Sequence, residues 1–352
     1  MVTRWFRTTD GLRPGERVRR ALGSRTALLV LLALLLLGLW LLAGAQGVTG
    51  QRLLSLAVRG VMLGGILALG AIGLTLIFGV LRIPNFAHGD LMTWGGYLAL
   101  FGLAVLPASA PLAPFSFGIE LLVLLVLVMP LVGLTGYLLD RLVFRRLRAR
   151  RAPSVILAMA ALGGAFFLRS VIYLGWGADF RNLYTGRPRP AIELFAGIRV
   201  RPDQLFILGL ALLLIFLLYL LLERSKMGKA MRATADNADL ARITGIDTES
   251  VIRWTWIIGG GLAGAGGVMY ALDTQLRPEM GWWLMLPLFA SVILGTIGNA
   301  YGALVGAMVI GLVWQMSTAF LNPAYGPGVA FLVLILVLLF RPQGIFGKPG
   351  GA

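Results

Sequence analysis

Residues 280–340 read MGWWLMLPLFASVILGTIGNAYGALVGAMVIGLVWQMSTAFLNPAYGPGVAFLVLILVLLF, a run of 61 residues without one charged side chain. A soluble domain has no need of such a run, whereas one helix crosses the hydrocarbon of a bilayer with about 20 apolar residues. Gly and Pro divide the run near Gly298–Gly302 and near Asn322–Gly328. The run therefore predicts several consecutive membrane-spanning helices.

The rest of the chain has the same character, because 58% of its 352 residues are hydrophobic and only 13% are charged. Further apolar stretches of suitable or nearly suitable length are Ala27–Ala45, Gly60–Leu81, Leu91–Leu106, Leu121–Leu139, Ala152–Leu168, Gln204–Leu222 and Trp254–Leu272. We predict an all-α, polytopic transmembrane bundle of about eight to ten spans. The segment 1–26 is a basic arm. The segment 27–45 is either a retained extra helix or a signal peptide that ends in Ala43-Gly44-Ala45.

The location of the positive charge predicts the orientation of the chain. The net charge is +16, and arginines gather in an N-terminal arm, in Arg141–Arg151 and in Glu223–Arg253. Even numbers of predicted spans separate these segments, so all three, and both termini, are expected on the cytoplasmic side of the plasma membrane. This pattern indicates membrane orientation and not nucleic-acid binding. The loop Trp176–Asp203 departs from it, because five arginines lie there on the predicted external side.

Composition also excludes several kinds of chemistry. The chain has no Cys and one His, which rules out disulfides and argues against a metal site. We expect no cofactor and no catalytic residue. Gly228-Lys229-Ala230 lacks the upstream Gly and the hydroxyl residue of a phosphate-binding loop, so any ATPase must be a separate polypeptide.

A short polar stretch, Arg82–Asp90, lies between two apolar spans. Pro84 disfavours a helix there, and an unwound backbone at membrane depth needs protein or a water-filled cavity around it. In one interpretation this is a re-entrant or broken segment whose Asn85, His88 and Asp90 line a substrate path. In the other it is an ordinary cytoplasmic turn. The intramembrane charges Arg59 and Arg169 are candidates for a role in substrate binding, because charge inside the membrane is costly. Both lie near outer span ends, where snorkelling to water is the explanation that we favour.

The internal polar loop predicts one helix over Met227–Thr244, followed by a stop at Gly245. Asp247 or Thr248 can cap the next helix. The small side chains along this loop leave a flat surface that a cytoplasmic partner protein could approach closely. The alternative is that the loop is a solvated connector between two spans. Glycines at Gly260-x-x-x-Gly264 and Gly298-x-x-x-Gly302 have the spacing that lets membrane helices pack closely.

Four motifs, in order along the chain, resemble one family. Pro84-Asn85-Phe86-Ala87-His88-Gly89-Asp90 resembles an element of branched-chain amino-acid ABC transporter permeases, and most closely of the H-type (LivH-like) member. Gly228-x-x-x-Arg232-Ala233 with Ala241-x-x-x-Gly245-Ile246 is similar to the cytoplasmic coupling loop of that family. Leu294-Gly295-x-x-Gly298-Asn299-x-x-Gly302-Ala303 and Arg341-Pro342-Gln343-Gly344-Ile345-Phe346-Gly347 are similar to its late segments. The resemblance covers about residues 52–347, which would form the permease domain.

This resemblance implies a multi-part importer of leucine, isoleucine, valine or related small amino acids. A second, M-type permease, two cytoplasmic ATP-binding subunits and an external substrate-binding protein would be its partners. Asn85, His88 and Asp90 would lie near the substrate path, and Gly228, Arg232, Ala233, Ala241 and Gly245 would form the ATPase coupling loop. Two alternatives stay open: a urea or short-amide permease of the same family, and a stand-alone secondary transporter, although the spans hold few of the carboxylates that ion coupling uses.

Overall fold

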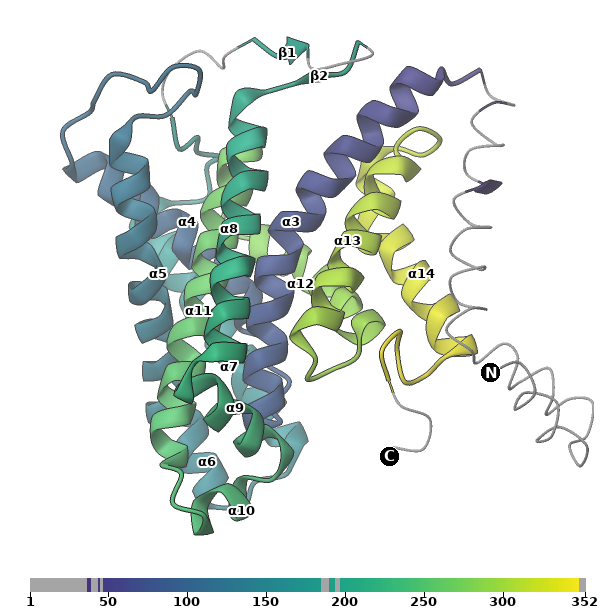
Figure 1. Ribbon diagram of the computed structural model, residues 1–352. Coiled ribbons are helices and arrows are strands. Elements are labelled where there is room, and N and C mark those ends of the chain that lie inside the picture. The colour runs from purple at the N-terminus through teal and green to yellow at the C-terminus, as the bar shows by residue number, and fades with distance from the viewer. Residues whose placement is uncertain (1–36, 39–43, 45–46, 185–189, 194–196, 348–352) are drawn as a thin grey trace, which may run out of the picture.

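The computed structural model describes residues 37–38, 44, 47–184, 190–193 and 197–347. These residues form a bundle of helices with one two-stranded hairpin (Figure 1). The all-α prediction is therefore confirmed for the described part of the chain. The predicted segment 27–45 falls almost entirely outside the described residues.

Six helices of the described part are long and apolar enough to cross a membrane. They are α3 (Gly50–Leu81), α5 (Ile119–Leu139) with its continuation through η3 (Asp140–Phe144) and α6 (Arg145–Ala149), α7 (Ser154–Trp176), α8 (Pro202–Arg224), α11 (Thr248–Asp273) and α13 (Ala300–Ser317). Three further apolar helices are shorter or less hydrophobic: α4 (His88–Val105), α12 (Met280–Gly295) and α14 (Gly326–Phe340), the last preceded by η4 (Pro323–Tyr325). The long uncharged run thus divides where Gly and Pro predict it.

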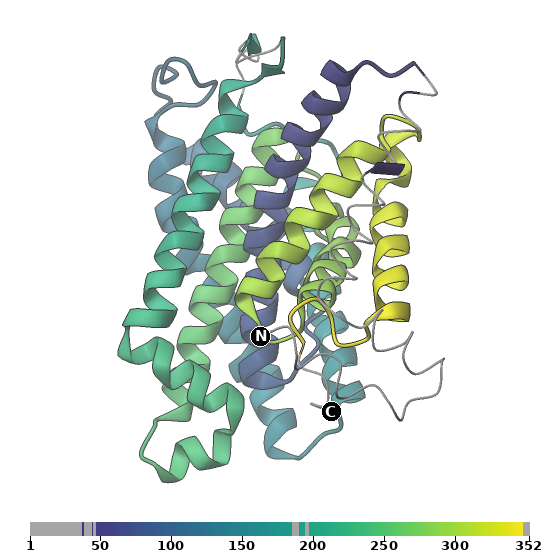
Figure 2. The ribbon, with the colours of Figure 1, turned by 45° about the vertical axis from the view of Figure 1, so that its right-hand side comes forward.

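Helices α3 and α11 form the centre of the bundle. Helix α11 packs against α3, α4 and α5, and α3 packs along α13 (Figures 1 and 2). Glycine makes the α3–α13 contact possible, because a Cβ on Gly311 would lie only 2.6 Å from the Gly60 carbonyl oxygen and from the Gly64 Cα. Small residues at such crossings let two backbones approach directly.

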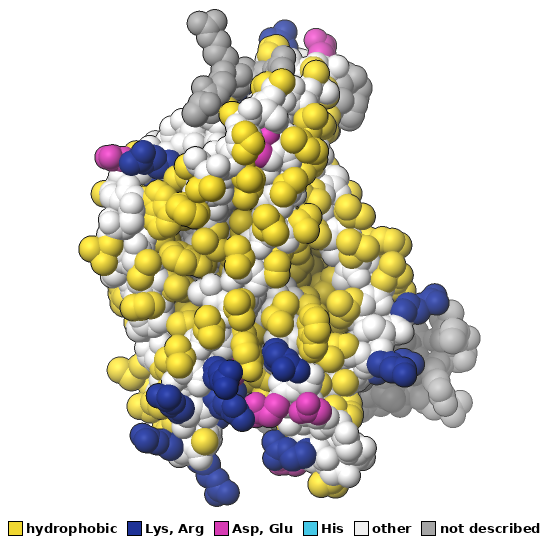
Figure 3. Space-filling model, turned by 90° about the vertical axis from the view of Figure 1, so that its left-hand side faces the viewer, with side chains coloured by type: hydrophobic (Ala, Val, Ile, Leu, Met, Phe, Trp, Pro, Cys, Tyr) yellow, Lys and Arg dark blue, Asp and Glu magenta, His cyan; other side chains and the backbone are white. Residues whose placement is uncertain are grey.

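The surface agrees with a bilayer environment. Figure 3 shows hydrophobic side chains across the middle of one face, with Lys and Arg gathered toward its lower end. The basic helix α6 and the loop helices α9 (Lys226–Asp236) and α10 (Ala238–Ile243) lie at that end, opposite β1 (Ile192–Glu193) and β2 (Arg199–Val200) (Figure 1). The antiparallel β1–β2 hairpin lies in the loop between α7 and α8 and is the one sheet of the described residues.

Candidate functional site

The polar stretch after α3 turns back into the bundle. Arg82 ends α3 in the left-handed conformation with φ 54°, and its N–H donates to the Phe78 carbonyl at 2.7 Å. Helix α4 then begins at His88, whose Nε2 atom lies 2.9 Å from the carbonyl oxygen of Gly70. Gly70 precedes the end of α3 by 11 residues, or about 17 Å of helix. The segment is therefore broken at membrane depth, and it is not a turn at the end of the bundle.

Asn85 and His88 are fully buried in this broken segment. The Oδ1 atom of Asn85 accepts the Ala87 N–H at 3.2 Å. Because a carbonyl oxygen only accepts, the Nε2 of His88 must carry the proton that it donates to Gly70. Within the described part of the chain, the Nδ2 of Asn85 and the Nδ1 of His88 have no hydrogen-bond partner. Buried polar atoms without partners are rare in folded proteins, and two of them lie here among apolar helices.

Asp90 forms a bidentate ion pair with Arg169 of α7. The Nε and Nη2 atoms of Arg169 donate to the two carboxylate oxygens at 2.9 and 3.0 Å. The Asp90 side chain is 1% exposed and that of Arg169 is 11% exposed. The prediction that Arg169 snorkels to water is therefore wrong, because its guanidinium is held inward by a buried carboxylate. No local pattern predicts this pairing, since the two partners are 79 positions apart in the chain.

Three adjoining cavities form a basic groove at the end of the bundle that carries the β1–β2 hairpin. The first has a volume of about 820 Å³, the second about 610 Å³ and the third about 280 Å³. Arg201 and Asp273 line both the first and the second, and Arg59 and Arg199 line both the second and the third. The arginines of the groove are Arg52, Arg59, Arg181, Arg199, Arg201 and Arg277. Among the described residues, Asp273 is the single acidic residue that lines these three cavities.

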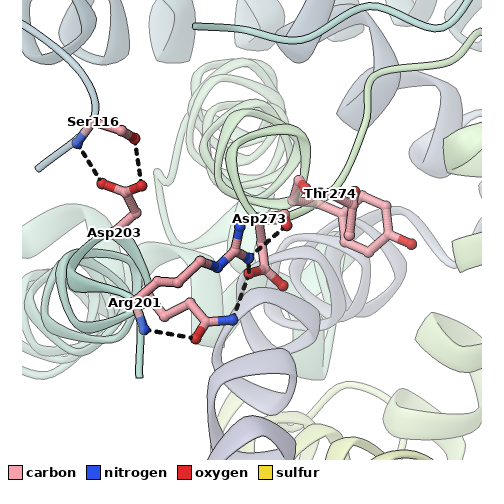
Figure 4. Close-up of polar contacts among 7 residues, drawn as sticks. Ser116, Arg201, Asp203, Asp273 and Thr274 are labelled. Carbon is pink, nitrogen blue, oxygen red and sulfur yellow. Dashed lines mark hydrogen bonds and ion pairs between the residues drawn. The ribbon is translucent and has the colours of Figure 1, made fainter. Parts of the chain in front are cut away.

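Polar contacts at the start of α8 hold the wall of the basic groove. Arg201 and Asp273 point toward one another, and an Nη2–Oδ1 distance of 2.6 Å joins them (Figure 4). Gln204 donates to the same carboxylate oxygen at 2.8 Å. On the other side of α8, Asp203 accepts the Ser116 N–H at 2.8 Å and also its hydroxyl (Figure 4). These bonds join α8 to the end of α11 and to the loop before α5.

The groove gives a structural role to the basic loop 176–203, which departs from the charge pattern of the other loops. Arg181, Arg199 and Arg201 come from that loop, and they meet Arg52 and Arg59 of α3. Arg59 and Arg199 are exposed, and neither has an ion-pair partner among the described residues. Sequence spacing alone could not show this convergence, because it depends on how α3 lies beside α8.

The internal loop forms two helices, so the prediction of one helix over Met227–Thr244 is wrong. Asn237 interrupts it: its Oδ1 accepts the Asp239 and Leu240 N–H groups at 3.1 and 2.9 Å and caps α10. Gly245 then takes φ +87° after α10. Asp247 caps α11, as predicted: its Oδ1 atom accepts the N–H groups of Glu249 and Ser250 at 3.1 and 3.2 Å.

The predicted coupling residues do not share one outer surface. Gly228 and Ala241 are buried, so Ala241 packs within the chain and adds nothing to a docking face. Arg232 is exposed and pairs with Glu223 at 3.4 Å, while Ala233 is half-buried. The loop instead presents two large apolar side chains, Leu240 and Ile243, which the sequence pattern did not single out.

Leu240 and Ile243 of α10 are 55% and 81% exposed. Large apolar side chains beside charged ones in a short loop helix are the signal that could have found this surface. A second missed contact joins the loop to the broken segment: the Nη2 of Arg82 donates to the Ala235 carbonyl of α9 at 3.2 Å. The loop helices and the polar segment are therefore in direct contact.

Three of the four glycines expected at helix contacts meet other elements or the neighbouring turn closely. A Cβ on Gly260 would lie 2.9 Å from the Gly133 Cα, and one on Gly264 would lie 2.9 Å from the Val132 side chain. A Cβ on Gly302 would overlap the Gly295 carbonyl. Gly298 differs, because no atom lies within 4 Å of its Cβ position and its φ of +83° serves the turn between α12 and α13.

Comparison with known proteins identifies the family. The family described as branched-chain amino acid transport system / permease component matches residues 56–338. The high-affinity branched-chain amino acid transport system permease protein BraD of Pseudomonas aeruginosa is 30% identical over 301 residues, which cover 83% of this chain and 95% of BraD. The corresponding protein LivH of Escherichia coli K12 is 30% identical over 300 residues, or 83% of this chain and 94% of LivH.

A probable branched-chain amino acid transport permease protein LivH of Methanocaldococcus jannaschii is 31% identical over 294 residues, with 80% of this chain and 89% of that protein covered. No solved structure matches the chain. These relatives are transport permeases, and the apolar helices make this chain a multi-pass membrane protein. The chain belongs to the family of permease components of branched-chain amino acid transport systems.

Proposed function

We propose that this chain is the H-type permease subunit of an ABC importer for branched-chain or closely related small amino acids. The family match over residues 56–338 carries this proposal. A second, M-type permease would complete the path, two cytoplasmic ATP-binding subunits would supply the energy, and an external substrate-binding protein would deliver the amino acid. Both termini would lie in the cytoplasm, with the α9–α10 end of the bundle facing the ATPases.

The exposed side chains of α10 support the site of ATPase docking. Leu240 and Ile243 offer an apolar contact on a short helix whose other exposed side chains, Asp239 and Arg242, are charged. Helix α9 packs against α3, α8 and α11, so a force on the loop reaches three spanning helices. Gly245 and the Asp247 cap connect the same loop directly to α11. A movement of the ATPases would thus tilt helices that pack through glycine, and alternating access needs two such packings.

The Arg82–Ala235 bond supports a direct link from the ATPase side to the substrate path. Arg82 begins the broken segment, and its donor atom lies 3.2 Å from the α9 carbonyl. Asn85 and His88 follow within one short stretch and hold polar atoms without partners in the described part. In this proposal those atoms contact the polar groups of the amino acid as it passes. Asp90 belongs to the same segment.

The basic groove supports docking of an external binding protein. Six arginines and one carboxylate of the described residues line it, so its field attracts an acidic protein surface. Charge complementarity of this kind speeds association and fixes orientation. The anionic headgroups of lipids offer the same charge, but they reach the molecule from its flank, whereas loops and helix ends at the end of the bundle that carries the β1–β2 hairpin line the groove.

Reconstitution tests the proposed function. Proteoliposomes that hold the complete transporter, with the binding protein outside, should accumulate labelled leucine only when ATP is inside. Vesicles that hold this chain alone should accumulate nothing. Uptake of labelled urea in place of leucine would move the substrate to the amide class. Accumulation by the chain alone under an ion gradient would refute the ABC assignment and favour a secondary transporter.

A further inference from the structure

The ion pair of Asp90 and Arg169 joins α4 to α7, a helix that is long and apolar enough to cross a membrane. Asp90 follows His88 by two residues, and His88 contacts Gly70 about 17 Å from the end of α3. Arg169 is 15 residues beyond the start of α7, or about 22 Å along the helix. Both distances place the pair far from the ends of α3 and α7 that lie on the α9 side of the bundle. A charge at this depth is costly and marks a functional pathway more often than a structural contact.

The pair also lies close to the outer flank of the chain. The guanidinium carbon of Arg169 is 5.5 Å from the ring centre of Phe166 and 5.1 Å from that of Trp282 on α12. The two rings stack at 6.4 Å, and they are 51% and 42% exposed. The guanidinium is therefore reached from the flank between two aromatic rings. Lipid on that flank would face a charged group, which is unfavourable.

Arg169 retains unused hydrogen-bond donors. A guanidinium has five N–H donors, and Asp90 takes one from Nε and one from Nη2. The Nη1 atom has no hydrogen-bond partner among the described residues, and the Arg169 side chain remains partly exposed. Arg148 makes a similar bidentate pair with Asp140, at 2.6 and 2.9 Å, near the α6 end of the bundle. No aromatic ring of the described residues stacks on that second guanidinium.

We propose that the flank of α7 and α12 around Arg169 lines the substrate path, and that Arg169 binds the carboxylate of the amino acid. This inference rests on the proposed function, since a second permease would cover the flank from the other side. The free Nη1 donors meet the carboxylate, and the rings of Phe166 and Trp282 contact the apolar side chain or the ammonium group. Asp90 is a positioning residue that holds the guanidinium in place and offsets its charge. Because Asp90 partly neutralises Arg169, the guanidinium binds the substrate carboxylate weakly. Weak binding lets the amino acid leave the site and move along the path.

The test compares two matched double variants in the complete reconstituted transporter. D90N/R169Q replaces the pair with neutral groups of similar shape, and D140N/R148Q does the same to the second pair. Three readouts are needed: subunit assembly, ATP hydrolysis stimulated by the binding protein, and the initial rate of labelled leucine uptake. We expect D90N/R169Q to assemble and to hydrolyse ATP. Its leucine uptake should fall about 10- to 100-fold, because the loss of one hydrogen bond to a charged group changes a rate or an affinity by about this factor. D140N/R148Q should transport at the wild-type rate.

Uptake by D90N/R169Q at the wild-type rate overturns the inference, and so does an equal loss in both double variants. If D90N/R169Q fails to assemble, R169K decides the question, because it keeps the charge and loses the planar donor geometry. A raised KM for leucine with an unchanged kcat in R169K supports carboxylate binding, and an unchanged KM overturns it. Absence of ATP-driven leucine uptake in the wild-type transporter would refute the proposed function itself.

Discussion

The Nε2 atom of His88 lies 2.9 Å from the carbonyl oxygen of Gly70, 18 residues earlier in the chain. This bond fixes the start of α4 against the middle of α3. Gly73 makes room for the imidazole, because a Cβ at that position would lie 3.1 Å from the His88 Cε1 and Nε2 atoms and would overlap the Gly259 carbonyl of α11. Three helices therefore meet at one glycine beside the broken segment.

Gly73→Ala should destabilise this junction. The added methyl group must displace the α11 backbone or the His88 ring, and overpacking of this kind costs about 1–3 kcal/mol. We expect a lower thermal unfolding temperature in detergent and reduced leucine uptake. Gly209→Ala on α8 is the matched control, because no atom lies within 4 Å of its Cβ position. Equal stability of the two variants would contradict the described packing.

The helical fold was predictable because helices that cross a bilayer need long apolar segments, and these are easily recognised in the sequence. The breaks of the 280–340 run, the Asp247 cap and the Gly245 turn follow from local chemistry, and the structure has each of them. The single loop helix was wrong because Asn237 offers its side chain to two N–H groups, which competes with helix continuation. Local propensity does not decide between those two outcomes.

The residues of the candidate site were predictable only where they lie together in one segment of the sequence. Asn85, His88 and Asp90 stand together in sequence, but the partner of Asp90 comes from α7 and the cover of Arg169 comes from α12. Arg59 and Arg199 likewise meet only through the packing of α3 beside the hairpin. Charge pairing over such separations depends on tertiary structure, and neither periodicity nor spacing encodes it.

The exposed face of α10 should control association with the ATP-binding subunits. Leu240→Asp and Ile243→Asp would each place a carboxylate in an apolar contact, where an unpaired charge is costly. We expect the ATPases to be lost from the purified complex while the permease pair stays intact. Asp239→Asn on the same helix is the control, since that side chain is 95% exposed and already polar. Retention of the ATPases by both apolar variants would exclude α10 from the interface.

The basic groove should govern the rate at which the binding protein associates. Arg59→Glu and Arg199→Glu reverse charges that have no ion-pair partner among the described residues, so folding should be little affected. We expect a several-fold lower association rate with immobilised transporter in nanodiscs, and a weaker dependence on salt. Arg59→Lys and Arg199→Lys keep the charge and should bind like the wild type.

Two outcomes would count against binding-protein docking at the groove. Binding that does not change in either charge-reversed variant would show that the protein docks elsewhere. Faster binding to the wild-type transporter when anionic lipid is removed from the nanodiscs would show that the groove holds lipid headgroups.

The absence of cysteine makes the proposed orientation directly measurable, because each introduced thiol is the only one in the chain. Ala110→Cys lies in the loop between α4 and α5, and Asp239→Cys lies on α10; both positions are exposed. A membrane-impermeant maleimide added to intact cells should label Ala110→Cys and leave Asp239→Cys unlabelled until the membrane is opened. The reverse pattern would place the α9–α10 loop outside, where no ATPase could reach it, and would leave the basic groove facing the cytoplasm. Labelling of both positions in intact cells would mean that the two loops lie on one side, which the span count of the bundle does not allow.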